Sequence, residues 1–224
     1  MNNNPLIEFK GDFKFDNTAR NILTAFTSSI DSKHKLSQNV INMKGMSGTK
    51  YRYWINNFVS LQKNSRYLEI GSWRGSTACS AMLGNKLSLT CIDNWSEFLA
   101  PKKNFLKNIK MCENSESEFK FIESDFRSVD YQSIGKFDIY LFDGPHLEKD
   151  QYDGIQLALP ALDETFTLIV DDWNWEQVRD GTNRALNDLG INTHCSITIT
   201  TNANPHWMEA TDWHNGYFIA LCSK

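Results

Sequence analysis

Short apolar runs alternate with longer amphipathic segments along most of this chain. Runs that are apolar throughout are typical of strands buried on both faces of a parallel sheet. We predict strands at Tyr67–Ile70, Leu87–Ile92, Phe119–Ile122, Phe137–Phe142 and Phe166–Val170. Between these runs apolar residues recur at helical spacing, which predicts helices at Ser76–Leu83, Ser96–Met111, Glu148–Leu159 and Trp175–Leu189. The alternation indicates an α/β fold with a parallel sheet.

The two ends of the chain show different patterns. Residues 1–50 are mostly polar apart from a predicted helix at Ala19–Ile30, and we interpret them as an N-terminal extension or lid. The main domain is then residues 51–224, and it begins with a predicted helix at Tyr51–Leu61. Near the C-terminus, Cys195–Thr201 alternates Ser and Thr with Ile, and Gly216–Cys222 is apolar, which predicts an antiparallel hairpin.

Composition narrows the functional classes. The 224 residues carry a net charge of -4, and Lys and Arg never form long runs, so we expect no nucleic-acid partner. The 5 cysteines form no C-x-x-C pair, as expected in a reducing compartment. No run approaches the ~20 apolar residues of a membrane span, and no signal peptide is evident, so we expect a cytoplasmic protein without a membrane partner. Aromatic residues in the N-terminal part permit a homodimer.

The run from Arg66 to Ser76 is the most informative part of the chain. An apolar strand ends near Glu69, a turn with Gly71 and Gly75 follows, and a helix comes next. Glycines in such a turn let the backbone approach a nucleotide-like ligand closely. A carboxylate at Glu69 would repel a pyrophosphate, whereas it suits a ligand that carries an amino group and a sulfonium.

Acids and polar groups follow each of the predicted parallel strands. Ligands of open α/β sheets bind outside the carboxyl ends of the strands, so we expect these groups to converge. The groups are Glu69, Asp93-Asn94-Trp95, Ser124-Asp125-Phe126, Asp143 with His146, and Asp171-Asp172.

These features resemble the class I S-adenosylmethionine (SAM)-dependent methyltransferases over about residues 51–222. The resemblance implies a Rossmann-like fold with a seven-stranded, mostly parallel sheet and a C-terminal antiparallel hairpin. By position, Asp93 would take the two ribose hydroxyls of SAM and Asp125 the adenine amino group. Trp95 would either stack on adenine or fill a core or rim position. The full set of implied SAM contacts is Glu69, Gly71, Ser72, Gly75, Ser76, Asp93, Asn94, Trp95, Asp125, Phe126 and Asp143.

Acids also suggest a metal ion beside the SAM site. Asp143, Asp171 and Asp172 follow the fourth and fifth predicted strands, so their carboxylates should converge, and Mg²⁺ favours oxygen ligands. The arrangement is similar to that of the catechol, caffeoyl-CoA and macrocin types of metal-dependent O-methyltransferase, which implies Mg²⁺ at these three acids. The alternative is that Asp171 and Asp172 cap the following helix.

His146 stands three residues after Asp143. In the catechol-type enzymes a basic residue at the matching position takes the substrate hydroxyl proton, and an imidazole can do so near neutral pH. The resemblance therefore implies His146 and Asp143 as catalytic residues. A metal ligand, a substrate hydrogen-bond donor and an ordinary loop histidine are the other interpretations of His146.

The sequence thus predicts a SAM-dependent methyltransferase that methylates a small-molecule hydroxyl, sugar-like or phenol-like, with Mg²⁺. A metal-independent methyltransferase and a non-catalytic SAM-binding or nucleotide-binding Rossmann-like protein are the alternatives. The glycine-containing loop Lys44–Gly48 is expected to close over the site.

Overall fold

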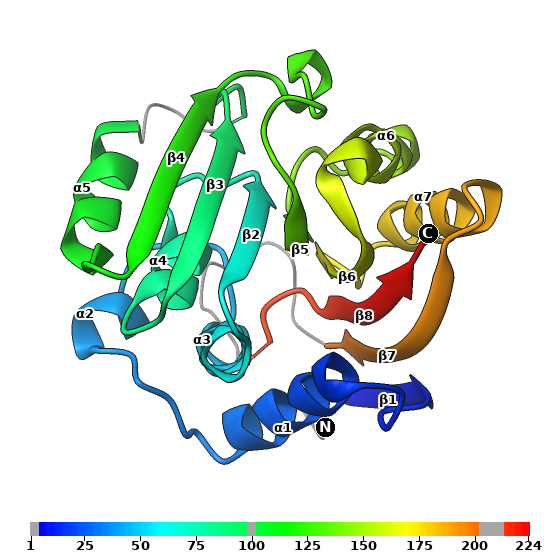
Figure 1. Ribbon diagram of the computed structural model, residues 1–224, viewed down its shortest axis with the longest axis horizontal. Helices are drawn as coiled ribbons and strands as arrows, with labels where there is room; N and C mark the ends of the chain where they lie inside the picture. Colours follow the sequence, from blue (N-terminus) through cyan, green and yellow to red (C-terminus); the bar gives the residue numbers. More distant parts are fainter. Residues whose placement is uncertain (1–4, 98–101, 202–212) are drawn as a thin grey trace.

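A computed structural model describes residues 5–97, 102–201 and 213–224 of the protein. The described residues form an eight-stranded sheet in the order β1-β7-β8-β6-β5-β2-β3-β4 (Figure 1). Its strands are β1 (Leu6–Gly11), β2 (Ser65–Ile70), β3 (Leu87–Asp93), β4 (Ser117–Glu123), β5 (Phe137–Phe142), β6 (Leu162–Asp171), β7 (Asn192–Thr200) and β8 (Tyr217–Ser223). Strands β2 to β6 pair in parallel, whereas β8, β7 and β1 pair antiparallel, so the predicted α/β fold is confirmed.

Helices cover both faces of the sheet, as the alternating pattern predicts. The helices are α1 (Asn17–Ile30), α2 (Gln38–Ile41), α3 (Thr49–Leu61), α4 (Ser76–Met82), α5 (Lys102–Cys112), α6 (Glu148–Ala158) and α7 (Glu176–Asp188), with 3₁₀ turns at Phe126–Ser128 and Leu159–Ala161. Helices α1, α3, α4 and α5 contribute to one apolar core, and α6 and α7 contribute to a second. None of the described helices is long and apolar enough to cross a membrane.

The central strands are apolar throughout because both of their faces are buried. In β2, Tyr67 belongs to the core under α3 and α4, while Leu68 and Ile70 belong to the core under α6 and α7. Neighbouring strands repeat this alternation, since successive side chains of a strand point to opposite faces. A sheet covered on both faces leaves its strand ends as the place where polar groups gather.

The sheet has one strand more than predicted. Strand β1 lies in the stretch that the sequence pattern marks as mostly polar, and it pairs antiparallel with β7 at the edge of the sheet. Helix α1 follows and buries Ile22 and Phe26 in the same core as Trp54 of α3. Residues 5–30 therefore share the core of the main domain, and the proposed boundary at residue 50 stays a prediction.

Most predicted elements agree with the structure to within a few residues. The C-terminal hairpin is confirmed as β7 and β8. Helix α5 differs most, because it begins at Lys102 and the residues Ser96 and Glu97 are not helical. The intervening residues 98–101, which the prediction placed in this helix, lie outside the described part of the chain.

Candidate active site at the carboxyl ends of the parallel strands

The turn after β2 needs both of its glycines. Gly71 has a φ of +87° and Gly75 a φ of +78°, in the left-handed region that glycine adopts without strain. A Cβ on Gly71 would lie 1.8 Å from the backbone oxygen of Asp143, so the turn is pressed against the end of β5. A Cβ on Gly75 would lie 2.9 Å from the Phe105 ring.

A cavity of about 310 Å³ opens at this edge of the sheet, over β2, β3 and β5. Most of the predicted SAM contacts line it: Gly71, Ser72, Ser76, Asp93, Asn94, Trp95, Asp125, Phe126 and Asp143. Glu69 and Gly75 do not. Gly75 instead sets the backbone at the start of α4, and Glu69 lies buried in β2 beneath the cavity floor.

Asp93 holds the two loops that border the cavity. One carboxylate oxygen accepts a hydrogen bond from the backbone N–H of Trp73 at 2.7 Å, and the other accepts from the N–H of Trp95 at 2.6 Å. Each carboxylate oxygen has a second lone pair, so Asp93 can still accept hydrogen bonds from two vicinal hydroxyls. Its position at the cavity wall agrees with the predicted ribose contact.

Trp95 lies at the packed rim of the cavity, and its stacking on adenine stays a prediction. Its ring lines the cavity and also packs against Phe121 and Phe105, with ring centroids 5.1 and 6.0 Å away. The indole N–H donates to the Trp73 backbone oxygen at 3.1 Å. The ring is therefore held in a fixed orientation as one wall of the cavity.

Asp125 and Phe126 form the wall nearest β4. The Asp125 carboxylate accepts from the backbone N–H of Arg127 at 2.8 Å, which fixes the short 3₁₀ turn behind it. Phe126 is buried and packs edge-on against Phe142. Both residues line the cavity, and their contacts with SAM stay predictions.

Glu69 is fully buried and accepts a hydrogen bond from the Tyr67 hydroxyl at 2.8 Å. Burial raises the pKa of Glu69 to about 7, although the hydrogen bond from the Tyr67 hydroxyl and the nearby hydroxyls of Thr77 and Ser72 oppose the shift. Its other carboxylate oxygen has no hydrogen-bond partner among the described residues. Glu69 is therefore only partly ionised near neutral pH, and it does not line the cavity.

The acceptor side of the cavity gathers Asp143, His146 and Asp172. One potential ligand atom from each of these residues lies within 4.8 Å of those of the other two. Among the described residues, no side-chain hydrogen bond is made by the Asp143 carboxylate. Burial raises the pKa of Asp143 well above its usual range, and the charges of Asp171 and Asp172 raise it further. Such a cluster of like charges favours a bound cation.

His146 and Asp172 form an ion pair, with 2.6 Å between Nε2 and Oδ2. Burial lowers the pKa of His146, but the contact with Asp172 outweighs it, so the pKa of the imidazole is raised. Burial raises the pKa of Asp172, but His146 and the Asn215 amide at 2.7 Å outweigh it, so the pKa of this carboxyl is lowered. Asp172 has a φ of +56°, and this strained backbone turns its side chain into the cavity.

Asp171, which was predicted as a metal ligand, is not part of the three-residue cluster. It is the last residue of β6, is 3% exposed, does not line the cavity, and accepts a hydrogen bond from the backbone N–H of Asp172 at 2.7 Å. Burial raises its pKa well above the usual range, while the Asp172 N–H and the Tyr217 hydroxyl oppose the shift. The three-residue cluster in the structure therefore contains His146 in place of Asp171.

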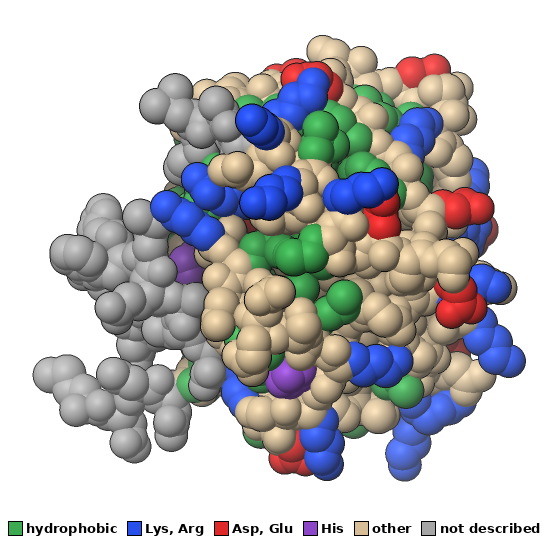
Figure 2. All heavy atoms as spheres, turned by 90° about the vertical axis from the view of Figure 1, so that its left-hand side faces the viewer, with side chains coloured by type: hydrophobic (Ala, Val, Ile, Leu, Met, Phe, Trp, Pro, Cys, Tyr) green, Lys and Arg blue, Asp and Glu red, His purple; other side chains and the backbone are tan. Residues whose placement is uncertain are grey.

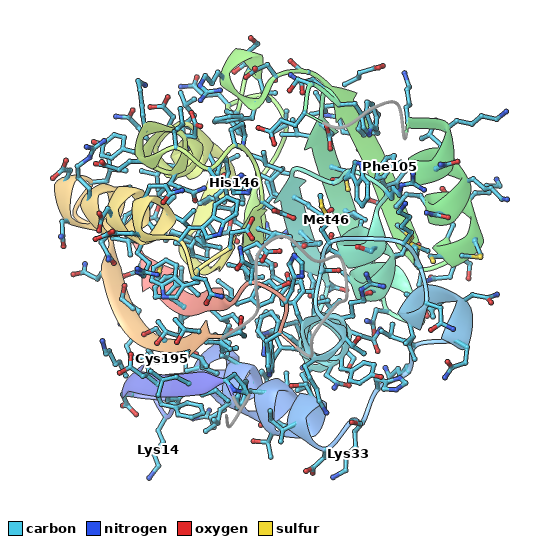
Figure 3. All side chains as sticks on the ribbon, turned by 180° about the vertical axis from the view of Figure 1, so that it is seen from behind. Lys14, Lys33, Met46, Phe105, His146 and Cys195 are labelled. Atoms are coloured by element: carbon cyan, nitrogen blue, oxygen red, sulfur yellow. The ribbon has the colours of Figure 1, made fainter. Side chains whose placement is uncertain are left out.

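The loop before α3, which the sequence predicts to close over the site, forms a wall of the cavity. Met46 and Ser47 line the cavity, as His146 does, and Figure 3 labels Met46 and His146 on their two loops. The buried Arg52 guanidinium donates to the backbone oxygens of Val40, Ile41 and Met43 at 3.1, 3.0 and 2.8 Å. These bonds fix the loop in place, and its role as a moving lid stays untested.

Two polar atoms test whether the cavity fits SAM and a cation. The Ser72 hydroxyl lines the cavity, and its residue is 4% exposed, yet it has no hydrogen-bond partner among the described residues. Buried polar groups are nearly always paired, so Ser72 indicates a polar ligand at the turn. The unpaired Asp143 carboxylate fits a cation beside it. The residues of the cavity therefore fit both SAM and a cation.

Comparison with known proteins finds one matching domain model and several solved structures of similar fold. Residues 68–173 match a family model described as a methyltransferase domain. TrmN from Thermus thermophilus is similar in structure, with a TM-score of 0.56 and 14% identity over 83% of this chain and 51% of that one. An O-methyltransferase from Bacillus cereus in complex with S-adenosylhomocysteine (SAH) gives a TM-score of 0.54 at 12% identity, over 92% of this chain and 91% of that one.

A third structure, provisionally described as an RNA methyltransferase from Pyrococcus horikoshii, gives a TM-score of 0.54 at 14% identity, over 94% of this chain and 98% of that one. The chain spans about half the length of the first solved structures it matches. No curated protein matches it significantly.

The fold is that of the class I methyltransferases, with one additional strand. The matched domain is described as a methyltransferase domain, and the shared fold agrees with that description. The solved structures are described as methyltransferases of different kinds, so they do not identify an acceptor for this protein.

Proposed function

We propose that the protein transfers a methyl group from SAM to a hydroxyl oxygen of a small, uncharged acceptor, sugar-like or phenol-like. The observation that carries this proposal is the single cavity that joins the Gly71 turn and Asp93 to the cluster of Asp143, His146 and Asp172. A donor site and a proton-accepting group thus share one cavity.

The donor end of the cavity is supplied by the first three parallel strands. When bound, SAM supplies an activated methyl group on a sulfonium. Asp93 accepts from the ribose hydroxyls, Ser72 and Ser76 hold the amino-acid part, and Asp125 accepts from the adenine amino group. Trp95 and Phe126 hold the adenine between them as apolar walls.

The acceptor end orients and deprotonates the hydroxyl. Asp172 holds the His146 ring in the cavity through the 2.6 Å ion pair, and Trp175 packs against the ring with centroids 4.6 Å apart. In its neutral form His146 removes the hydroxyl proton, and Asp172 stabilises the imidazolium that results. Because this ring is packed on one side and paired on the other, it needs little rearrangement to act.

Asp143, His146 and Asp172 would hold a divalent cation, which would lower the pKa of a bound hydroxyl. Two carboxylates suit Mg²⁺, and an imidazole extends the choice to Mn²⁺ and similar ions. His146 is then a ligand in one arrangement and the base in the other. The metal-independent alternative keeps His146 as the base and tolerates a chelator.

The charge of the cavity favours an acceptor without phosphates. Asp93, Glu97, Asp125, Asp143 and Asp172 line it, and no described lining residue is Lys or Arg. The segments 98–101 and 202–212 contain no Lys or Arg in sequence either. On the face in Figure 2, Lys and Arg side chains are spread widely, and Asp and Glu side chains lie among them. Phosphate binding needs clustered cations, so a nucleic-acid acceptor fits poorly.

The test is SAH formation from SAM with paired acceptors. Neutral sugars and catechol-like phenols are compared with their phosphorylated forms and with transfer RNA, each with MgCl₂, MnCl₂ or EDTA. We expect turnover with an uncharged hydroxyl compound and at least about a hundredfold loss in His146→Gln, the usual minimum contribution of a general base. Methylation of RNA alone would contradict the proposed acceptor, and SAH binding without turnover on any acceptor would favour the non-catalytic alternative.

A cytoplasmic location and a homodimer are further predictions. Separation of cell fractions and light scattering of the purified protein test them.

A further inference from the structure

The positive charge of Arg52 near the cavity has no anionic partner among the described residues. Arg52 in α3 is 2% exposed, and no described salt bridge includes it. Its three backbone acceptors satisfy N–H groups but carry only partial charge. Burying a guanidinium without a counter-ion is costly, so proteins normally pair such a group with an anion.

Two hydroxyl groups connect this guanidinium to the cavity. Arg52 Nε donates to Ser47 Oγ at 2.9 Å, and Ser47 Oγ lies 3.0 Å from Ser76 Oγ. Ser47 and Ser76 both line the cavity, and both are buried. A Cβ on Gly45 would lie 2.0 Å from Ser76 Oγ, so the loop that carries Ser47 is packed closely on Ser76.

The chain of bonds has a natural direction. Since Ser47 accepts from a cation, its own proton is free to go to Ser76, and the Ser76 proton is then free to point into the cavity. A charged donor at one end polarises such a chain and strengthens each bond along it. The free end suits an anion, and no Lys or Arg among the described lining residues competes for that anion.

We propose that Arg52, Ser47 and Ser76 form a relay that binds the carboxylate of the methionine part of SAM. Arg52 is a positioning residue in this relay, because it acts through the two serines and does not touch the ligand itself. The relay rests on the proposed function, since it assumes that SAM occupies the cavity. It also explains why the loop of residues 40–47 is tied to α3 rather than left free.

The test compares two ligands that differ only in the carboxylate. SAH and decarboxylated SAH, which keeps the amino group, are titrated calorimetrically into the wild type and Ser47→Ala. We expect Ser47→Ala to weaken SAH binding about tenfold, as for loss of a hydrogen bond to a charged group, and to change binding of decarboxylated SAH less than about twofold. Ser80→Ala is the matched control, because its hydroxyl is equally buried on α4 but donates to the Ser76 backbone oxygen at 2.7 Å.

A second variant guards against a purely structural effect. Arg52→Lys keeps the charge, but one ammonium group cannot hold three backbone oxygens and Ser47 together, so we expect a lower melting temperature and the same selective loss of SAH binding. An equal loss for both ligands, or no loss in Ser47→Ala, would overturn the relay. A wild type that binds neither ligand would overturn the proposed function and the relay with it, whereas one that binds both equally would overturn the relay alone.

Discussion

The carboxylates in the two halves of the cavity differ in their hydrogen bonding. On the side of β2 and β3, both oxygens of Asp93 accept backbone N–H groups, at 2.7 and 2.6 Å. On the side of β5 and β6, Asp143 has no side-chain hydrogen bond among the described residues, and one oxygen of Asp171 lacks a partner. Burial and mutual repulsion raise the pKa of Asp143 well above its usual range.

The difference shows how one sheet edge serves two tasks. The donor half is organised by the backbone before any ligand binds, which lowers the entropy cost of binding. The acceptor half keeps charges that repel one another, which destabilises the free protein and strengthens its attraction for a cation or a proton. The repulsion between these carboxylates is therefore what prepares the acceptor half to bind a cation or a proton.

The largest effect should come from Gly71→Ala, because Gly71 is where the halves meet. The new Cβ would lie 1.8 Å from the Asp143 backbone oxygen on a backbone with φ +87°. Overpacking and left-handed strain together predict a loss of about 3–5 kcal/mol in the free energy of unfolding, measured with urea. Gly190→Ala is the control, because its φ is +66° but nothing lies within 4 Å, and it should lose only about 1 kcal/mol. Equal losses of unfolding free energy in the two variants would mean that the backbone around Gly71 and Asp143 shifts to make room for the new Cβ.

Glu69→Gln measures how much one buried acid of the donor half contributes to the pH dependence of stability. The pKa of Glu69 is raised from 4.5 to about 7, so the folded state binds this proton more tightly than the unfolded state. The stabilisation is complete below pH 4.5 and is lost as the pH rises through 7. Relative to the variant, the wild type should lose about 3 kcal/mol in the free energy of unfolding between pH 4.5 and pH 8.

Urea unfolding across this pH range measures the effect. The exposed Glu116→Gln is the control for loss of one carboxyl group. Parallel curves for wild type and Glu69→Gln would show that Glu69 titrates alike in both states.

Asp93→Ala should break the organisation of the donor half. It removes the ribose acceptor and leaves the N–H groups of Trp73 and Trp95 without their partner. We expect SAH affinity to fall about 100-fold, which corresponds to about 2.7 kcal/mol. Asp12→Ala is the control, since Asp12 likewise accepts a backbone N–H, from Lys14 at 2.7 Å, but does not line the cavity. Unchanged SAH affinity in Asp93→Ala would remove the assigned role of Asp93.

Asp143→Asn should have the smallest effect and the opposite sign. Removing one of the repelling charges should raise the melting temperature in EDTA by about 3 °C, as expected for about 1 kcal/mol in a chain of this size. The same change should abolish the stabilisation that MgCl₂ or MnCl₂ gives the wild type. Asp163→Asn removes a carboxylate that is paired with Arg66, so it should not stabilise the protein. A melting temperature that does not respond to either ion in the wild type would contradict a cation site.

The sequence predicts the donor half better than the acceptor half for a physical reason. Gly71 and Asp93 follow apolar strands directly, and parallel strands bring their carboxyl ends to one edge whatever the details. The choice between Asp171 and Asp172 depends on which face each side chain meets. Asp171 is still part of β6, whereas the φ of +56° at Asp172 reverses the chain there, and no residue type signals that reversal.

The N-terminal segment shows a second limit. The residues of β1 remain largely exposed even though the strand is paired, so its sequence lacks the apolar run of the central strands. Arg52 resembles any helical arginine in sequence. Its role depends on backbone oxygens at Val40, Ile41 and Met43, and backbone groups leave no trace in the residue pattern.

Calorimetric titration of SAH into the wild-type protein, first with EDTA and then with MgCl₂ or MnCl₂, tests the central claim most directly. The organised donor half should bind SAH in EDTA, and the acceptor half should give a separate heat of cation binding that Asp143→Asn lacks. Absence of SAH binding with and without the cations would contradict the assignment of the cavity to SAM.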